Sequence, residues 1–335
     1  MHNFIIVGAS NASSAMRDAV FGTIFENAIP GAHYIAPSMP SGFRRKLQNR
    51  LTRNCFRGII PSSIRLMGEL KYHQFLPLFS TRNDNCIIFC PGTHPFERIS
   101  PMLIRKLRRH HPECPLIIYL IDGIDRIAQI SEVSVEKLLD FFGRFDAVYT
   151  YDRTDSLRYT IPFMEIPLWI SDKVPEKTPA YDLYFCGRDK NRSDLLMQIH
   201  DRATSAGLKC NYHITSLAKE NARNGVQPSE WTPYKETVDE AMKANCILEV
   251  LTENNYGATL RYKEAVIYNK KLLTNNPEIT RLPYYDERWM RYFEKAEDID
   301  LEWLARIEDV DYGYKGDFSA ESFLRNIENT YNANR

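Results

Sequence analysis

The stretch CILEVLTENNYGATLRYKEAVIYNKKLLTN, residues 246–275, contains the pattern that decides the fold. Two short apolar runs, Cys246–Leu251 and Lys270–Asn275, flank the helix-like segment Leu260–Tyr268. Short apolar runs bounded by polar loops are typical of buried strands, and strand–helix–strand order at this spacing is typical of a mostly parallel sheet with covering helices. We therefore expect an α/β fold around this stretch.

The same alternation continues through the rest of the chain. Further strands are expected at Phe4–Gly8, His33–Ala36, Cys86–Cys90, Pro115–Asp122, Asp146–Tyr151, Tyr181–Gly187 and Leu208–Ile214. Helices are expected at Ser13–Asn27, Glu97–His110, Val133–Phe142, Arg192–Ser205, Tyr234–Lys243 and Ala320–Asn332. Four prolines in the segment 162–179 predict a linker, because proline stiffens the chain and removes hydrogen-bond donors. The sequence thus predicts two successive α/β units.

The composition limits the class of protein. The chain has 335 residues, of which 44% are hydrophobic and 26% charged, and these values fit two globular domains and exclude wholesale disorder. The net charge is zero, which argues against a dedicated nucleic-acid binder. The zero hides an asymmetry, because Met1–Ile121 holds 15 basic and 6 acidic residues. Anionic partners are therefore expected at the front of the chain.

Targeting and metal signals point to a cytoplasmic protein without a metal. No apolar run reaches the roughly 18–20 residues that span a bilayer, and the N-terminus resembles a strand rather than a signal peptide. Several of the seven cysteines lie in apolar strand-like runs, which favours reduced, buried thiols. No cysteine or histidine pairs have zinc spacing, and the acidic triplets at 298–300 and 309–311 are interpreted as helix starts and turns.

The loop and helix after Leu251 form a candidate anion site. Gly257 lies in the loop, Thr259 can cap the helix, and Arg261 offers a positive fork for phosphate. Glu264 could accept hydrogen bonds from a ribose diol. A helix start at the mouth of a sheet favours anions, because its free N–H groups and dipole face outward. The alternative is that Arg261 and Glu264 are surface residues that form a local ion pair.

These residues carry a resemblance to a known family. The pattern of Gly257, Thr259, Arg261, Glu264 and Ala265, followed by KKLLTNN, resembles the donor-binding segment of bacterial GT-B glycosyltransferases, particularly those of lipopolysaccharide and capsule biosynthesis. The segments Tyr181–Leu196 and Phe145–Trp169 are similar to the opening of their second domain and to their interdomain passage. One departure is Tyr256, which stands where many retaining members have a second glutamate, eight positions before Glu264.

The resemblance implies a GT-B architecture, in which two Rossmann-like domains face each other across a cleft. Residues 1–168, joined by a C-terminal helix at 317–335, would form the acceptor domain, and residues 175–316 would bind the nucleotide sugar. The implied reaction is transfer of a sugar from a nucleoside-diphosphate sugar to a bacterial surface glycan or lipid-linked acceptor. This reaction requires no cofactor beyond the donor substrate.

Two further loops carry candidate functional residues. The loop GRDKNR follows a strand and precedes a helix, so Gly187 permits a tight turn and Arg188, Lys190 and Arg192 can approach a diphosphate; the alternative is a solvated loop of mixed charge. In the first domain, Asp122 ends a strand and is the candidate general base on an acceptor hydroxyl, with His94 as its rival. The alternatives are a turn-forming aspartate and a locally bonded loop histidine.

The segment Phe43–Arg57 is a candidate membrane-contacting helix. It contains six basic residues and no acid, with apolar residues near helical spacing. Such a helix can lie on an anionic membrane surface, although a solvated helix face is the ordinary alternative. Arg44–Arg57 therefore predicts possible peripheral association with the inner membrane face.

Three other classes of function stay open at this point. A nucleotide-sugar epimerase of the same architecture would need no basic acceptor face. A dinucleotide-dependent oxidoreductase would use the loop GASNASS, residues 8–14, but Ser10 and Ser13 stand where the second and third glycines of the fingerprint belong. A non-catalytic binding protein could keep the fold without the chemistry.

Overall fold

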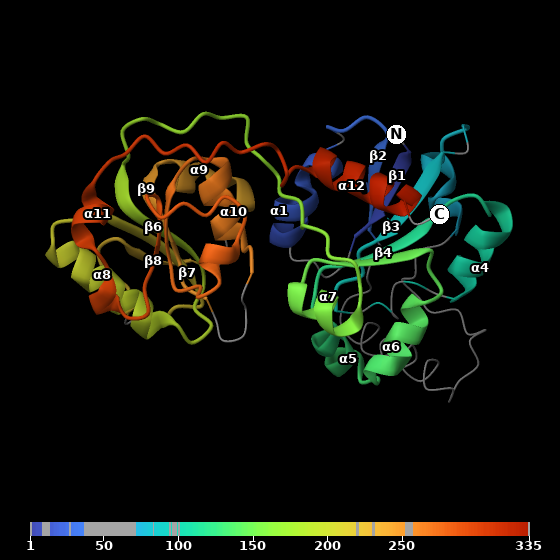
Figure 1. The fold of residues 1–335 in the computed structure, drawn as a ribbon, viewed down its shortest axis with the longest axis horizontal. Coiled ribbons are helices and arrows are strands. Elements are labelled where there is room, and N and C mark those ends of the chain that lie inside the picture. Colours follow the sequence, from blue (N-terminus) through green and yellow to red (C-terminus); the bar gives the residue numbers. More distant parts are fainter. Residues whose placement is uncertain are drawn as a thin grey trace. The chain divides into compact units, whose positions relative to one another are not determined.

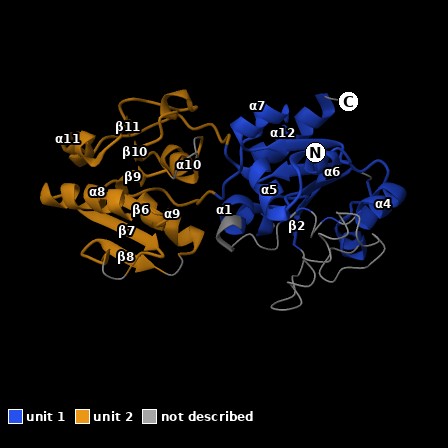
Figure 2. Ribbon diagram, turned by 90° about the horizontal axis from the view of Figure 1, so that it is seen from below, with its two compact units in different colours: residues 1–169, 318–335 blue, residues 170–317 orange. Residues whose placement is uncertain are grey.

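The computed structural model describes residues 2–8, 14–26, 28–36, 72–82, 84–93, 95, 99, 101–218, 221–229, 232–251 and 257–333. Contacts divide the chain into two compact units (Figure 2). Unit 1 comprises Met1–Trp169 and Phe318–Arg335, and unit 2 comprises Ile170–Asp317. The residues 162–169, which the sequence placed in the linker, contact unit 1, since Thr150 and Phe163 form a parallel bridge.

Unit 1 is built on a five-stranded parallel sheet with the order β2-β1-β3-β4-β5. Its strands are β1 (Asn3–Val7), β2 (Ala32–Ile35), β3 (Asn85–Phe89), β4 (Leu116–Leu120) and β5 (Ala147–Thr150). The short helices η1 (Tyr72–Gln74) and η2 (Leu76–Leu78) precede β3. Strands β1, β3 and β4 are buried along their whole length, which explains their continuous apolar sequences.

Helices cover both faces of this sheet (Figure 1). One face packs against α4 (Pro101–His110), α5 (Ile124–Ser131) and α6 (Val135–Phe142). Tyr119 faces the opposite side, where its ring meets Phe323 of α12 (Ala320–Ala333) at a centroid distance of 4.8 Å. Helix α1 (Ser14–Phe25) contacts α12, and α7 (Arg153–Tyr159) follows β5. The last helix of the chain therefore completes unit 1.

Unit 2 contains a six-stranded parallel sheet with the order β11-β10-β9-β6-β7-β8, which can be followed in Figure 2. Its strands are β6 (Tyr181–Arg188), β7 (Cys210–Thr215), β8 (Val226–Ser229), β9 (Ala244–Glu249), β10 (Lys271–Thr274) and β11 (Met290–Tyr292). Strands β6, β7 and β8 form one half of the sheet, and β9, β10 and β11 form the other half. After β8 the chain returns to the centre of the sheet, and β9 is added on the other side of β6. This is the strand order of the doubly wound Rossmann fold.

The helices of unit 2 also form two layers. Helix α8 (Ser193–Ser205), η5 (Ala296–Asp298) and α11 (Leu301–Ala305) share one core with the sheet. Helices α9 (Tyr234–Met242) and α10 (Leu260–Ile267) cover the other face, and η4 (Ile279–Arg281) follows β10. The predicted α/β class with two Rossmann-like units and a C-terminal helix returning to the first is confirmed.

Several predicted elements differ from those observed. Helix α5, which has eight residues, was not predicted; Glu132, with φ of 52°, ends α5, and Ser134 caps α6. Strands β8 and β11 were missed because they lack an apolar run and lie at the sheet edges. No helix among the described residues is long and apolar enough to span a membrane.

Some sequence hypotheses lie outside the described residues. These are His94, the basic stretch Arg44–Arg57, and residues 9–13 of GASNASS. Gly8 is described, and a Cβ atom there would lie 1.8 Å from the Tyr34 hydroxyl, so a larger residue would require the Tyr34 side chain to move.

Candidate functional site

The point where the sheet of unit 2 changes direction lies between β6 and β9. These strands are parallel neighbours, with Leu183 opposite Cys246 and Tyr184 opposite Ile247 (Figure 1). The loop after β6 leads into α8, and the loop after β9 leads into α10. Ligands of open α/β sheets bind outside the carboxyl ends of strands at such a switch point. The Gly187–Arg192 loop and the Thr259–Glu264 segment both lie here.

Arg192 is a largely buried cation bonded to backbone carbonyls. Its Nε and Nη2 atoms donate to the Arg188 carbonyl at 3.1 and 2.9 Å, and Nη1 donates to the Val250 carbonyl. Burial and the nearby charge of Arg261 lower the pKa of Arg192 to about 10. Among the described residues, no carboxylate forms an ion pair with it. The guanidinium therefore keeps its charge at neutral pH in a place suited to an anion.

The loop before Arg192 is shaped to fit its side chain. A Cβ atom at Gly187 would lie 2.8 Å from Nη2 of Arg192, so a side chain there would displace the guanidinium. Lys190 and Asn191 have positive φ values of 47° and 62°, which make the loop tight. Asp189 accepts hydrogen bonds from the backbone N–H groups of Arg192 and Ser193 at 3.2 and 2.8 Å. Arg188 and Lys190 are exposed beside this loop.

Helix α10 begins with Thr259, as the sequence predicted. The Thr259 hydroxyl accepts a hydrogen bond from the Tyr262 N–H at 3.3 Å, which satisfies one free donor of the first turn. Gly257 precedes it with φ of 153°, a backbone conformation that side chains rarely adopt. The Gly257 carbonyl accepts a hydrogen bond from the side-chain amide of Asn276 at 3.2 Å.

Arg261 and Glu264 form an ion pair with each other. The pair is not on the surface, because the exposed fraction is 16% for the Arg261 side chain and 0% for that of Glu264. The Oε2 atom of Glu264 accepts from Arg261, while Oε1 is buried without a hydrogen-bond partner. Burial raises the pKa of Glu264, against the charge of Arg261 and a hydrogen bond from Tyr234. A buried carboxylate oxygen without a partner is unusual, and a donor hydroxyl from a ligand would satisfy it.

Glu249 was not predicted from the sequence, although it is hydrogen-bonded to Thr259 at the start of α10. It ends β9, is 2% exposed, and accepts hydrogen bonds from the hydroxyls of Thr259 and Thr274. Burial raises its pKa, and the two hydroxyls, Arg261 and Arg192 lower it. A single acid inside the apolar run CILEV is the signal that could have identified it.

Of the two candidate bases, the structure describes Asp122, which belongs to unit 1. Asp122 follows β4 with a side chain that is 26% exposed, and its Oδ1 atom lies 3.9 Å from Nη1 of Arg126. Its neighbour Asp155 caps α5 by accepting a hydrogen bond from the Ile124 N–H at 2.7 Å. Burial, Asp122 and Asp152 raise the pKa of Tyr151 to about 12. Asp122 is therefore accessible in a strongly acidic neighbourhood.

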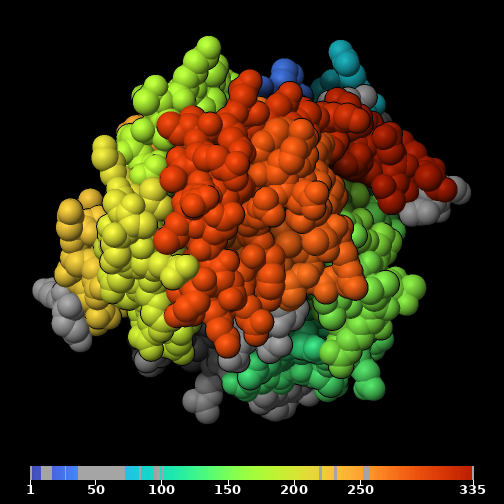
Figure 3. Space-filling model, turned by 60° about the vertical axis from the view of Figure 1, so that its left-hand side comes forward, coloured from blue at the N-terminus to red at the C-terminus, as the bar shows by residue number. Residues whose placement is uncertain are grey.

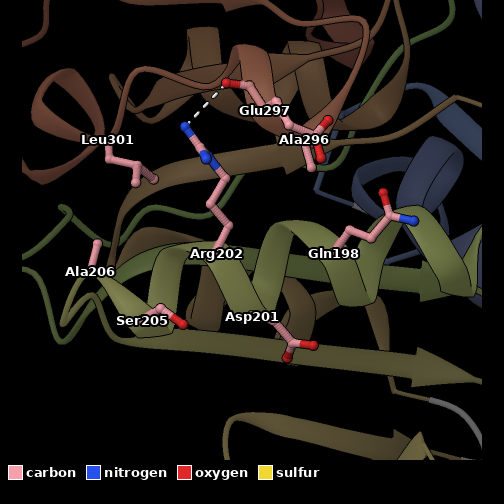
Figure 4. A pocket seen from close by; sticks show the side chains of 8 residues that line it. All are labelled: Gln198, Asp201, Arg202, Ser205, Ala206, Ala296, Glu297 and Leu301. Carbon is pink, nitrogen blue, oxygen red and sulfur yellow. Dashed lines mark hydrogen bonds between the residues drawn. The ribbon is translucent and has the colours of Figure 1, made fainter.

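A groove of about 640 Å³ lies between α8 and η5 on the surface of unit 2. Figure 3 shows α8 and the segment containing η5 and α11 side by side, and Figure 4 shows Arg202 donating to the Glu297 carbonyl, at 3.1 Å. None of the sequence-predicted site residues lines this groove. Its lining residues are Gln198, Asp201, Arg202, Ser205, Ala206, Ala296, Glu297 and Leu301.

Comparison with known proteins gives structural likenesses only. No protein-family model matches the chain. No curated protein sequence matches it either. An α-glucosyltransferase solved with UDP and a 13-mer DNA matches with 11% identity and a TM-score of 0.47, covering 98% of this chain and 90% of that one. Spinosyn forosaminyltransferase matches with 12% identity and a TM-score of 0.42, covering 98% and 95%.

A DNA-modifying β-glucosyltransferase matches with 12% identity and a TM-score of 0.39, again covering 98% and 95%. All three are glycosyltransferases by name. Their identities and TM-scores are too low to transfer an activity, so the chemistry of this chain has to be argued from its own residues.

Proposed function

We propose that the protein is a glycosyltransferase whose second unit binds a nucleoside-diphosphate sugar. The observation that carries the proposal is the pair of buried guanidinium groups, Arg192 and Arg261, at the switch point of a Rossmann-type sheet. A diphosphate carries at least two negative charges, and the two helix starts beside these groups add free N–H donors. In a glycosyl transfer, the same positive groups would stabilise the departing diphosphate.

The proposal gives a role to each residue of the site. Arg192 and Arg261 would bind the diphosphate, and the exposed Arg188 and Lys190 would add positive charge at its outer side. Glu264 would accept from the ribose hydroxyls through its unpartnered oxygen. Gly187, Gly257 and Thr259 would shape the loops so that the backbone approaches the phosphates. The donor itself is the only small molecule required.

Unit 1 would hold the acceptor. Asp122 would remove the proton of the acceptor hydroxyl as it attacks the sugar, with His94 as the alternative base. The resemblance noted in the sequence implies a bacterial surface glycan or lipid-linked acceptor, handled at the cytoplasmic face of the membrane. We propose that this reaction needs no metal.

Binding of nucleotides tests the donor site directly. We expect UDP or GDP to bind by calorimetry and to raise the melting temperature, and Arg192→Met to weaken binding of that diphosphate at least tenfold. Arg202→Met is the matched control, since Arg202 also lies on the α8 side of unit 2 and donates to a backbone carbonyl. If the wild type binds neither diphosphate, or both variants behave alike, the donor site is elsewhere.

The reaction type is tested by products. Incubation with the nucleotide sugar that binds should release nucleoside diphosphate in the presence of an acceptor, and chelation by EDTA should leave the rate unchanged. Interconversion of two nucleotide sugars without release would instead identify an epimerase. Binding without any turnover would support a non-catalytic protein.

Asp122→Asn tests the base. We expect donor affinity to stay at the wild-type value, because Asp122 belongs to unit 1, and turnover to fall by roughly 10²–10⁴. Arg126→Gln is the control that removes the neighbouring cation without removing the carboxylate. Near wild-type turnover of Asp122→Asn would reject the assignment and transfer attention to His94.

A further inference from the structure

The hydrogen bonds of Glu249 connect three separate parts of unit 2. Its two carboxylate oxygens accept from Thr259, at the start of α10, and from Thr274, at the end of β10. Glu249 itself ends β9. Glu249 is 2% exposed and Thr274 is 0% exposed, and, unlike those of Glu264, both carboxylate oxygens of Glu249 already accept hydrogen bonds within unit 2. Their contribution to binding has to act through other residues.

Each of the two threonine hydroxyls also accepts a hydrogen bond from a backbone N–H group. The Thr259 hydroxyl donates to Glu249 and accepts from the Tyr262 N–H at 3.3 Å. The Thr274 hydroxyl donates to Glu249 and accepts from the Asn276 N–H at 3.0 Å. A hydroxyl has one proton, so donation to the carboxylate fixes the orientation in which its lone pairs meet these N–H groups.

The chain of contacts continues to both ends of the loop that joins β9 to α10. The Asn276 amide donates to the Gly257 carbonyl at 3.2 Å, just before α10. The neighbouring Asn275 accepts from the Leu251 N–H at 2.6 Å, just after β9. Residues that follow β10 therefore hold both flanks of this loop, and Glu249 determines where they lie through Thr274.

Glu249 also lies close to the two arginines. Its charge acts on Arg192 and on Arg261, although it forms no ion pair with either in the described part of the chain. Two buried guanidinium groups repel each other, and a buried carboxylate between them offsets the repulsion. The carboxylate of Glu249 is held by hydroxyls, so it occupies none of the hydrogen-bond donors of the two arginines.

We propose that Glu249 is a positioning residue for diphosphate binding, which acts through Thr259 and Thr274 to hold the start of α10, together with Leu251 and Gly257, beside Arg192 and Arg261. The inference rests on the proposed function, because it assigns the anion site to a diphosphate. Glu249 and Thr274 would support the diphosphate site without touching the diphosphate.

Thr274→Val is the decisive variant, because it keeps the shape of the side chain and removes only the hydroxyl. We expect the affinity for UDP and for inorganic pyrophosphate, measured by calorimetry at 20 °C, to fall by roughly tenfold. Thr274→Ser restores the hydroxyl and should bind both probes within about twofold of the wild type. Ile247→Val, a buried change on β9, is the control for a loss of stability alone.

A double-mutant cycle shows whether Thr274 acts through Glu249. In a Glu249→Gln background, Thr274→Val should cost less than about twofold in pyrophosphate affinity, because the contact it removes is already altered. Equal losses in both backgrounds would overturn the proposed path. If Thr274→Val melts at a lower temperature yet binds like the wild type and Ile247→Val, Glu249 is a structural residue only.

The wild type separates this inference from the proposed function. If it binds neither UDP, GDP nor pyrophosphate, the diphosphate site fails and the role of Glu249 fails with it. If it binds and only the Thr274→Val prediction fails, the diphosphate site stands and Glu249 is not its positioning residue.

Discussion

Glu264 and Arg261, which the sequence assigned to two different parts of a nucleotide, form an ion pair with each other. Helical spacing placed them on one face of α10, and the structure shows that they bind each other while both are largely buried. A surface ion pair of this kind would contribute little, but removal of one partner from a buried pair leaves an uncompensated charge. The pair therefore couples the proposed ribose contact to the proposed phosphate contact.

Alanine variants distinguish the proposed ribose contact of Glu264 from the proposed phosphate contact of Arg261. Glu264→Ala should weaken nucleotide binding by roughly 10- to 150-fold, since a hydrogen bond to a charged group is worth about 1.5–3 kcal/mol. Arg261→Ala should weaken diphosphate binding more than nucleoside binding. Calorimetry with the nucleoside, its monophosphate and its diphosphate measures both, below the melting temperature of each variant. Folded variants that bind every nucleotide like the wild type would remove the support for this site.

Cys186 provides a chemical probe of the same place. It lies on β6, the strand that precedes the Gly187–Arg192 loop, with its Sγ atom 3.6 Å from the Thr237 hydroxyl. Among the described cysteines it is the one that is not buried. With Cys55 replaced by serine, iodoacetamide should modify Cys186, and UDP at about ten times its dissociation constant should slow the reaction roughly tenfold. An unchanged rate with saturating UDP would place the nucleotide elsewhere.

The sequence predicted which residues gather in unit 2 better than it predicted how they bond. Arg192, Thr259 and Glu264 were identified because each follows a strand or opens a helix, and such positions follow from local patterns. Glu249 and Thr274 were missed because their side chains act inside strands, where the apolar pattern hides them. A carboxylate that binds two hydroxyls from distant segments can be recognised only when the strand order is known.

At the scale of elements, the sequence identified the central strands and missed the short peripheral ones. Buried parallel strands such as β4 have continuous apolar runs, so they are visible in one dimension. The two central residues of strand β8, Gln227 and Pro228, are exposed, and the strand pairs with β7 at the edge of the sheet. Its sequence alone therefore carries no strand signal.

The basic stretch Arg44–Arg57 leads to a prediction about membrane binding. Each cation near an anionic surface contributes about 1 kcal/mol, so loss of three cations alone weakens binding roughly 100-fold. Reversing the charges of Arg44, Arg45 and Lys46 adds repulsion and should therefore weaken sedimentation with phosphatidylglycerol vesicles by at least about 100-fold. High salt should weaken it further. The matched control reverses three exposed cations of α4, namely Arg105, Lys106 and Arg109. Equal losses in both variants would attribute binding to overall charge.

At the scale of the whole molecule, the two units have separate hydrophobic cores. The core of unit 1 joins its sheet to α4, α5 and α6, and the core of unit 2 joins its sheet to α8 and α11. Helix α12 comes from the far end of the chain and still belongs to unit 1, where Phe323, Leu324 and Ile327 are buried. Unit 1 is therefore built from two segments of the chain that are separated in sequence by the whole of unit 2.

This organisation predicts two unfolding transitions that respond to different changes. Phe323→Ala removes the ring that packs on Tyr119, and such a truncation costs about 3–5 kcal/mol, which lowers the melting temperature of a unit of this size by roughly 6–20 °C. Only the transition of unit 1 should move in calorimetry. UDP at about 100 times its dissociation constant should raise only the other transition, by roughly 5–10 °C.

Leu304→Ala is the corresponding change in unit 2, because Leu304 is 0% exposed within the second core. It should lower the transition that UDP raises and leave the Phe323-sensitive transition in place. The UDP affinity of the folded Phe323→Ala protein should equal that of the wild type, since α12 belongs to unit 1 and the proposed donor site belongs to unit 2. A single transition that both variants lower equally would mean that the two cores unfold together, and the donor site would then depend on unit 1 for its stability.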